Sequence, residues 1–267
     1  MKVRVTRIAV VSISLMVIGL ILTGQNVVAI DPATVAGMWL FDDGAGDVAK
    51  DSSGKGLDAK LIGGPQWVNG KFGKALEFDG VAAYVEVPEH ANPTVAITVS
   101  VWAKSNTETW NQHGWLVEKR NAYMLHPIQN DTTVGWIFCN GGCWNQPFTW
   151  SDGAVGPEDI TQWHMYTGTF DSATGERKLY IDGKVENTLE LNKASINVDT
   201  GPLYIGNDTC CAGRFGDGVV DEVAVFSVAL SEAEIQVIMK GGLQSVLTAV
   251  EPADKLSTTW ADIKTQD

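Results

Sequence analysis

Short runs of alternating apolar and polar residues, separated by turn-forming residues, are the feature that most constrains the fold of this chain. In residues 97–104, for example, Ile97 and Val99 alternate with Thr98 and Ser100. Successive side chains of an extended strand point to opposite faces, so this period of two is typical of a half-buried strand. One such face has to meet another sheet, which predicts an all-β, antiparallel sandwich.

Runs of this kind, bounded by Gly, Asp, Asn and Pro, extend over most of the chain. They predict strands over residues 37–41, 75–78, 83–87, 97–104, 115–119, 122–125, 133–138, 163–170, 177–181, 184–188, 203–205 and 219–226. Asp182-Gly183, between two of these runs, has the composition of a two-residue hairpin turn with positive φ at both positions. Ser231 and Glu234 have the spacing of a capping box before an apolar stretch, so we expect one short helix after the last strand.

The first 29 residues have the pattern of an export signal. Basic residues come first, an apolar stretch covers residues 8–22, and small residues precede position 30. The apolar stretch is shorter than the roughly 20 residues that cross a bilayer as a helix, so an uncleaved anchor is the second choice. We therefore divide the chain into a signal peptide (1–29), one domain (30–244) and a C-terminal tail (245–267), and expect a secreted, periplasmic or cell-surface protein.

The charge of the chain limits its partners. The formal net charge is −13, and removal of Lys2, Arg4 and Arg7 with the signal would change it to −16. An acidic surface repels phosphate backbones and anionic lipid. We therefore expect no nucleic-acid partner and no membrane span in the mature chain, whereas a glycan, an extracellular protein or a divalent cation is compatible with this charge.

The cysteines Cys139, Cys143, Cys210 and Cys211 all lie after the signal. Disulfides form and persist in exported proteins, and four cysteines allow three pairings. Local pairing would close a short loop between Cys139 and Cys143 and a strained bond between the adjacent Cys210 and Cys211, whereas cross-pairing would tie two loops together. Both alternatives stay open, and the spacings fit zinc and redox motifs poorly.

Several phrases of the sequence occur in a characteristic order. They include WLFDDGAG (39–46), DSSGKG (51–56), GKALEFDG (73–80), ITVSVW (97–102), QWH (162–164), YIDG (180–183), GVVDEV (218–223) and ALSE (229–232). Together they resemble laminin-G-like jelly-roll domains of the concanavalin A-like lectin/glucanase superfamily. The resemblance implies a two-sheet antiparallel jelly-roll sandwich, whose concave side or loop rim often binds carbohydrate or protein, frequently with calcium. It does not fix a ligand.

Acidic residues in the glycine-rich segment 42–56 form a candidate metal site. Calcium takes about six to eight oxygens from carboxylates and carbonyls on flexible loops, which this segment supplies. The resemblance also suggests that the first and last strands lie close together, which would bring Asp221 toward Asp51. We name Asp42, Asp51 and Asp221 as ligands of a structural Ca²⁺; the alternative is that these acids cap turns.

A cluster of tryptophans and amides between residues 110 and 150 is the candidate ligand site. Flat rings stack on the apolar faces of sugars while amides orient the hydroxyls. Trp115 and Trp136 lie inside strand patterns and are expected in the core. The candidate ligand-binding residues are Trp110, His113, Asn140, Trp144, Asn145 and Trp150. Packing of the loop tryptophans within the protein is the alternative for Trp110, Trp144 and Trp150.

The sequence carries no motif for hydrolysis. It contains neither a Glu-X-Asp-X-Glu strand nor the His-Glu-X-X-His and Gly-X-Ser-X-Gly patterns. Asp221 and Glu222 are adjacent, so a strand points them to opposite faces. We name no catalytic residue and take a secreted, non-catalytic carbohydrate-binding or adhesion module as the leading hypothesis. The alternatives are a structural or protein–protein interaction domain without a sugar ligand and, third, a glycosidase.

Overall fold

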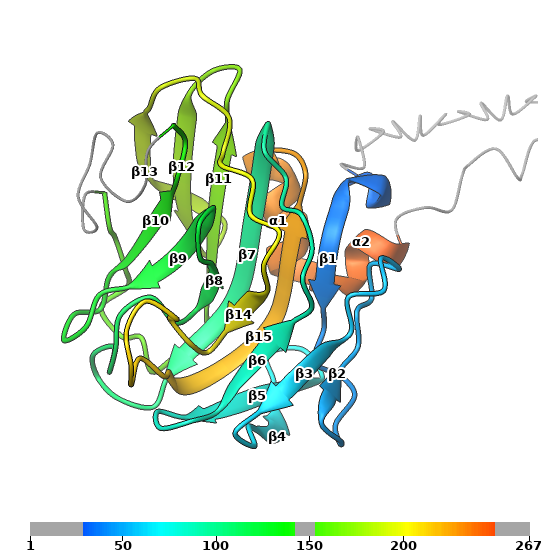
Figure 1. The fold of residues 1–267 in the computed structure, drawn as a ribbon, viewed down its shortest axis with the longest axis vertical. Helices are drawn as coiled ribbons and strands as arrows, with labels where there is room; N and C mark the ends of the chain where they lie inside the picture. The colour runs from blue at the N-terminus through cyan, green and yellow to red at the C-terminus, as the bar shows by residue number, and fades with distance from the viewer. Residues whose placement is uncertain (1–28, 142–152, 249–267) are drawn as a thin grey trace, which may run out of the picture.

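The computed structural model describes residues 29–141 and 153–248, and these form two antiparallel sheets packed face to face (Figure 1). The eight-stranded sheet contains, in spatial order, β13 (Lys184–Glu190), β12 (Glu176–Ile181), β11 (His164–Asp171), β7 (Ala96–Ser105), β15 (Asp217–Phe226), β5 (Lys74–Asp79) and β4 (Gln66–Asn69), with β1 (Val35–Trp39) paired to β15. The seven-stranded sheet contains β10 (Val134–Phe138), β9 (Tyr123–Pro127), β8 (Val117–Lys119), β14 (Leu203–Ile205), β6 (Tyr84–Val87), β3 (Ala59–Ile62) and β2 (Val48–Ala49). The architecture is the predicted jelly-roll sandwich.

The predicted strands are all present, with shifted ends, whereas β2, β3 and β4 were missed. The missed strands are two to four residues long. Strands β2 and β3 each contain one buried residue, and β4 contains none. Their apolar alternation is therefore too short to separate them from the surrounding glycine-rich turns. At the predicted hairpin, Asp182 and Gly183 have φ angles of 51° and 72°, as a type I′ turn requires.

Two helical segments follow the last strand. Helix α1 (Glu232–Gly241) begins with the predicted capping box: Ser231 accepts from the Glu234 amide, and the Glu234 side chain accepts from Ser231. Helix α2 (Gln244–Thr248) crosses the predicted domain end at residue 244, and its Val246 is buried. The first residues of the predicted tail thus pack on the domain, because α2 adds an apolar side chain to the layer under α1. A short 3₁₀ turn, η1 (Pro32–Thr34), precedes β1.

The eight-stranded sheet is covered on both faces. One face packs against the seven-stranded sheet through the main core, which includes Val99 and Leu125. Its other face packs against α1, where Trp102 and Met165 meet Ile235. In Figure 1, α1 lies behind β7 and β15, and α2 lies beside β1. Strand β7 is therefore buried on both faces rather than half-buried as its sequence suggested.

The polar residues on the helix-covered face of β7 are buried because they hydrogen-bond within the layer. Thr98 Oγ1 donates to the Val228 carbonyl at 2.7 Å, and Ser100 Oγ lies 3.0 Å from Thr167 Oγ1 on the neighbouring strand. Each hydroxyl thus keeps a partner away from water, which removes most of the cost of its burial. The other face of the seven-stranded sheet receives no helix from the described residues, and we call it the open face; the loop after β14 covers part of it, since Glu118 is buried there and accepts from the Thr209 amide.

None of the helices within residues 29–141 and 153–248 is long and apolar enough to cross a membrane. The predicted signal peptide, apart from its last residue, and the tail after residue 248 lie outside the described residues.

Candidate functional site

The open face of the seven-stranded sheet carries a row of side chains that crosses the strands from one edge to the other. Strand register pairs Lys60 with Glu86, Glu86 with Tyr204, Tyr204 with Glu118, Glu118 with Met124, and Met124 with Ile137. Paired residues on neighbouring strands point to the same face, so these side chains share the face turned away from the core, where Glu118 and Met124 are buried and the others are at least partly exposed. This row, and the loops beside it, define the candidate site.

Three half-buried aromatic rings lie at the centre of this face. The ring centroid of Tyr84 is 6.0 Å from that of Tyr204 and 6.1 Å from that of Phe215. Tyr84 and Tyr204 alternate with the core residues Val85 and Ile205 along β6 and β14, which directs the tyrosines outward. We call Tyr84, Tyr204 and Phe215 the aromatic platform.

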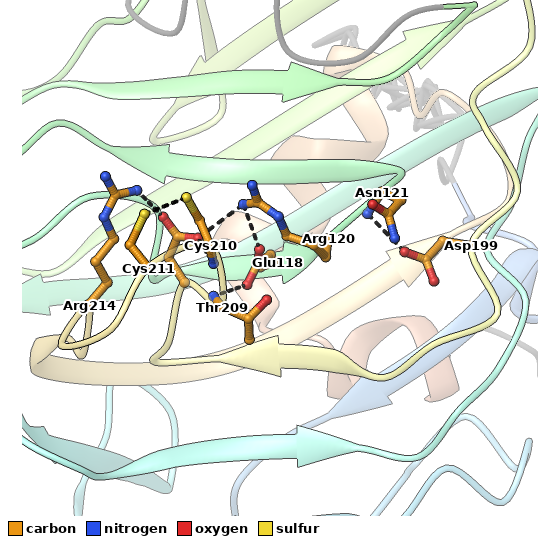
Figure 2. Close-up of polar contacts among 9 residues, drawn as sticks. Glu118, Arg120, Asn121, Asp199, Thr209, Cys210, Cys211 and Arg214 are labelled. Atoms are coloured by element: carbon orange, nitrogen blue, oxygen red, sulfur yellow. Dashed lines mark hydrogen bonds and ion pairs between the residues drawn. The ribbon is translucent and has the colours of Figure 1, made fainter.

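Beside the platform lies a carboxylate–arginine cluster, which we define as Glu118, Arg120, Asp208 and Arg214 (Figure 2). Asp208 accepts from Arg214 at 2.5 Å and from Arg120 at 3.2 Å. Glu118 accepts from Arg120 at 3.2 Å and from the Thr209 amide at 2.7 Å. The two carboxylates thus tie β8, the residue after it and the loop that follows β14 into one network.

The four members of the cluster differ in exposure. Both carboxylates are fully buried, whereas the side chains of Arg120 and Arg214 are 28% and 25% exposed. Burial raises the pKa of Glu118 to about 7; the Thr209 amide and Arg120 act against this rise, and Asp208 adds to it. The carboxylates therefore serve as internal supports, and the guanidinium groups are the charged atoms that the cluster presents to solvent.

Residues 207–215 form the loop between β14 and β15, and hydrogen bonds between its two ends close it into a turn. Asn207 and Phe215 form a β-bridge, and the Asp208 amide donates to the Arg214 carbonyl at 3.0 Å. At its tip, Cys210 and Cys211 are exposed, with their Sγ atoms 2.7 Å apart. The loop supplies one ring of the platform, one carboxylate and one arginine of the cluster.

Of the predicted ligand residues, His113 lies beside the cluster. Its ring centroid is 5.4 Å from that of His126, and its Nδ1 accepts from the Gln129 amide at 3.2 Å. Burial, followed by the charge of Arg214, lowers the pKa of His113. The adjacent Gly114 has a φ of 73°, and a Cβ there would lie 2.6 Å from Asp208 Oδ2, so only glycine allows this approach.

Trp110 and Asn140 are internal rather than ligand-facing. Trp110 is fully buried, its indole donates to the Thr132 carbonyl at 3.1 Å, and its ring meets Trp115 with centroids 5.5 Å apart. Asn140 is also buried, and its amide donates to Asn192 Oδ1 at 2.8 Å. Packing within the protein, the alternative for Trp110, is thus the observed arrangement of both side chains, and their contact with a ligand stays a prediction. Trp144, Asn145 and Trp150 lie outside the described residues.

The three predicted calcium ligands divide between two turns. Asp51 accepts from four backbone amides, those of Met38, Ser53, Lys55 and Leu57, which is the turn-capping arrangement. Asp42 and Asp221 instead accept from the Lys74 and Phe72 amides at 2.8 and 3.0 Å, so both meet the turn between β4 and β5. Within residues 29–141 and 153–248, no group of three or more acidic, histidine or cysteine side chains is placed to hold a metal ion.

Asp221 nevertheless has the one feature that fits a bound cation or a proton. Its Oδ1 is buried and has no hydrogen-bond partner among the described residues. Burial, with smaller contributions from the nearby Glu222 and Asp42, raises the pKa of Asp221 to about 8 against the opposing Phe72 and Lys71 amides. Asp42 and Asp221 thus lie at the same turn and Asp51 at another, and calcium bound by these residues stays a prediction.

The disulfide pattern also stays a prediction. Cys139 is buried at the end of β10, and Cys143 lies outside the described residues.

Two antiparallel sheets packed face to face, one of them covered by helices on its outer face, define the class of concanavalin A-like sandwiches. The chain belongs to the Laminin_G_3 family of the concanavalin A-like lectin/glucanases superfamily, whose model matches residues 79–236. The predicted resemblance is thereby confirmed. A comparison with curated proteins found none with significant sequence similarity to this chain.

Solved structures of the same fold include several binding domains. The binding domain of Paraclostridial Mosquitocidal Protein 1 is 15% identical, with a TM-score of 0.59, and the match covers 78% of this chain and 52% of that one. The binding domain of botulinum neurotoxin DC in complex with rat synaptotagmin II is 13% identical, with a TM-score of 0.56 and coverages of 79% and 52%. This chain thus spans about half the length of these two toxin domains.

A third structure matches over almost its whole length. Domain 4 of AbnA, an extracellular GH43 arabinanase from Geobacillus stearothermophilus, in complex with arabinotriose, is 17% identical, with a TM-score of 0.55 and coverages of 76% and 97%. At such low identity these likenesses show the fold alone.

The site that sequence reasoning missed is the aromatic platform and its charged cluster. Tyr84 and Tyr204 lie in the predicted strands 83–87 and 203–205, and their alternation with core residues was the available signal that they face outward. Arg120 joins Glu118 to Asp208, 90 positions further along the chain, and no local pattern indicates this link.

Proposed function

We propose that this protein is an exported, non-catalytic carbohydrate-binding module whose ligand lies on the open face of the seven-stranded sheet. One observation carries the proposal: the half-buried rings of Tyr84, Tyr204 and Phe215 lie beside two partly exposed arginines that buried carboxylates support. Aromatic rings cover the apolar face of a sugar ring, and fixed donors orient its hydroxyls.

The charge of the cluster favours a neutral glycan. Its two arginines face two carboxylates, and the protein as a whole carries a formal net charge of −13. An anionic ligand would meet an acidic protein at a site with little excess positive charge. Hydroxyl groups can still accept hydrogen bonds from the exposed edges of Arg120 and Arg214.

The burial of the carboxylates supports binding rather than hydrolysis. A glycosidase needs a carboxylic acid that reaches the glycosidic oxygen and a second carboxylate on the other side of the bond. Glu118 and Asp208 are fully buried beneath the arginines and Thr209. Both carboxylates already have internal partners, as expected of residues that position the arginines.

A protein ligand is the second candidate. The same fold occurs in a toxin binding domain that was solved with synaptotagmin II, as well as in the arabinanase domain that was solved with arabinotriose. The aromatic platform supports either partner, because tyrosines are also enriched in protein interfaces.

The test is binding of the purified protein to an array of neutral oligosaccharides, followed by calorimetry on the best ligand. We expect Tyr204→Ala to weaken binding roughly tenfold, about 1.4 kcal/mol. Trp163→Ala is the matched control, because Trp163 is a partly buried aromatic residue that packs in the layer of α1. Equal affinity of wild type and Tyr204→Ala, or no array signal with capture of an extracellular protein instead, would contradict the proposed glycan site.

A further inference from the structure

The exposed tip of the loop 207–215 carries two adjacent cysteines whose side chains point toward each other (Figure 2). Their Sγ atoms are 2.7 Å apart, and a disulfide bond has an S–S length of about 2.05 Å. A shift of less than about 1 Å would therefore bring the two sulfurs into bonding distance. Both thiols are open to solvent, so a reagent can reach them.

The backbone around the pair is fixed by the same cluster that supports the open face. The Thr209 amide donates to Glu118 Oε2 at 2.7 Å, and the Cys210 amide donates to Asp208 Oδ1 at 2.9 Å. These bonds attach the residues directly before and at the pair to buried carboxylates. The two sulfurs are thus held near each other by anchored backbone rather than by chance rotamers of a free loop.

Two arginines lie next to the pair, and their positive charges oppose the rise in the pKa of Cys210. The charges of Arg120 and Arg214 act to lower the pKa of Cys210, although its hydrogen bond with Cys211 and burial raise the pKa overall. Cys210 and Cys211 in turn raise the pKa of Arg214, which places both sulfurs near its guanidinium group. Nearby cations are the environment in which cysteines exchange with disulfides.

We propose that Cys210 and Cys211 are a reversible vicinal disulfide site that exchanges with small-molecule disulfides and thiols. One cysteine thiolate attacks a sulfur of oxidised glutathione, forms a mixed disulfide and releases one glutathione thiol. The second cysteine then attacks the protein sulfur of the mixed disulfide and releases the second glutathione. The two cysteines are oxidised, the glutathione disulfide is reduced to two thiols, and the two cysteine protons end on these thiols.

Adjacency makes the bond easy to reverse. The Cα atoms of neighbouring residues are about 3.8 Å apart, below the usual range of about 4.4–6.8 Å for bridged cysteines. Strained and exposed disulfides are the ones that thiols reduce readily. The site is therefore a thiol–disulfide pair whose state follows the surrounding redox conditions.

Tryptic peptides separate this pair from the other cysteines. Cleavage after Lys193 and Arg214 gives a peptide, residues 194–214, that contains Cys210 and Cys211, while Cys139 and Cys143 fall in residues 121–177. The native protein is equilibrated with oxidised glutathione, alkylated with iodoacetamide, digested without reduction and analysed by mass spectrometry. A second sample is treated with dithiothreitol before alkylation.

In the oxidised sample we expect peptide 194–214 to carry no alkyl group and to have the mass of its dithiol form minus two hydrogens. In the reduced sample we expect the same peptide to carry two alkyl groups. The Cys211→Ser variant lacks the resolving thiol, so we expect its peptide to retain a glutathione adduct on Cys210. Two alkyl groups on the wild-type peptide after oxidation, or a disulfide link to peptide 121–177, would overturn the proposal.

Discussion

Arg214 donates to the buried Oδ2 of Asp208 at 2.5 Å, across a turn of six residues. The carboxylate has no exposed surface, and its other oxygen accepts from Arg120 at 3.2 Å. One aspartate thus fixes two arginines that come from different parts of the fold. The orientation of the charged atoms on the open face depends on a residue that cannot itself meet a ligand.

Asp208→Asn should destabilise the protein, because it removes a buried charge to which two arginines are paired. Breaking a buried ion pair costs about 3–5 kcal/mol; the partial exposure of both arginines reduces this to roughly 1–3 kcal/mol. Urea unfolding measures the change. Asp58→Asn is the control, since the Lys50–Asp58 pair is largely exposed, and we expect no significant change there. Equal effects of the two substitutions would show that Asp208 has no special supporting role.

Trp110→Ala should lower the free energy of unfolding by about 3–5 kcal/mol, the usual cost of truncating a buried aromatic side chain. Trp110 is fully buried and its indole hydrogen-bonds to the Thr132 carbonyl. Chemical denaturation of the variant gives the value. Tyr204→Ala is the comparison, because half-buried Tyr204 should cost less stability and more ligand affinity. If Trp110→Ala left the free energy of unfolding unchanged and abolished ligand binding, the result would contradict this prediction and show that Trp110 contributes to binding.

Stability should decrease as pH rises toward 8, through the buried carboxyl of Asp221. Its pKa in the fold is about 8, above the ordinary 3.8, so the native state holds a proton that the unfolded chain releases. This contribution is complete below about pH 4 and is lost as pH rises through the folded pKa. Asp221→Asn should weaken the dependence and stabilise the protein at pH 8, relative to pH 5, by on the order of 2 kcal/mol; Glu118 and Glu222, whose pKa values burial raises to about 7, keep the rest of the dependence. Thermal unfolding from pH 5 to pH 8, with EDTA present, tests it; parallel curves for wild type and variant would contradict it.

Calcium bound beside Asp42 and Asp221 should raise the melting temperature at pH 8. At this pH the buried carboxylate of Asp221 becomes ionised, and a bound cation would offset the free-energy cost of its charge. Melting curves with calcium chloride and with EDTA measure this shift. Asp221→Asn should abolish the shift. Asp51→Asn should lower the melting temperature by the same amount in both conditions, because Asp51 accepts from the amides of its own turn. A calcium shift lost in Asp51→Asn alone would place the ion at the other turn.

The fold followed from local patterns, whereas the site depends on pairing between distant strands. Alternation along residues 97–104 and the Asp182-Gly183 turn are properties of a few neighbouring residues, and both have the predicted structure. Trp110 looked like a loop residue because polar residues surround it in sequence, yet the fold places it against Trp115. The candidate platform requires the register of β6 beside β14, which only the completed sheet defines.

Strand β15 pairs with β7, β5 and β1, although it follows the first of these by more than a hundred residues. The sheet therefore lacks a central strand until nearly the whole domain has been synthesised, and pairing over such separations is slow. During synthesis, the unfinished chain would expose the unpaired edges of β5 and β7. Translocation as an unfolded chain, followed by folding outside, would keep these edges apart from other chains until the last strand arrives.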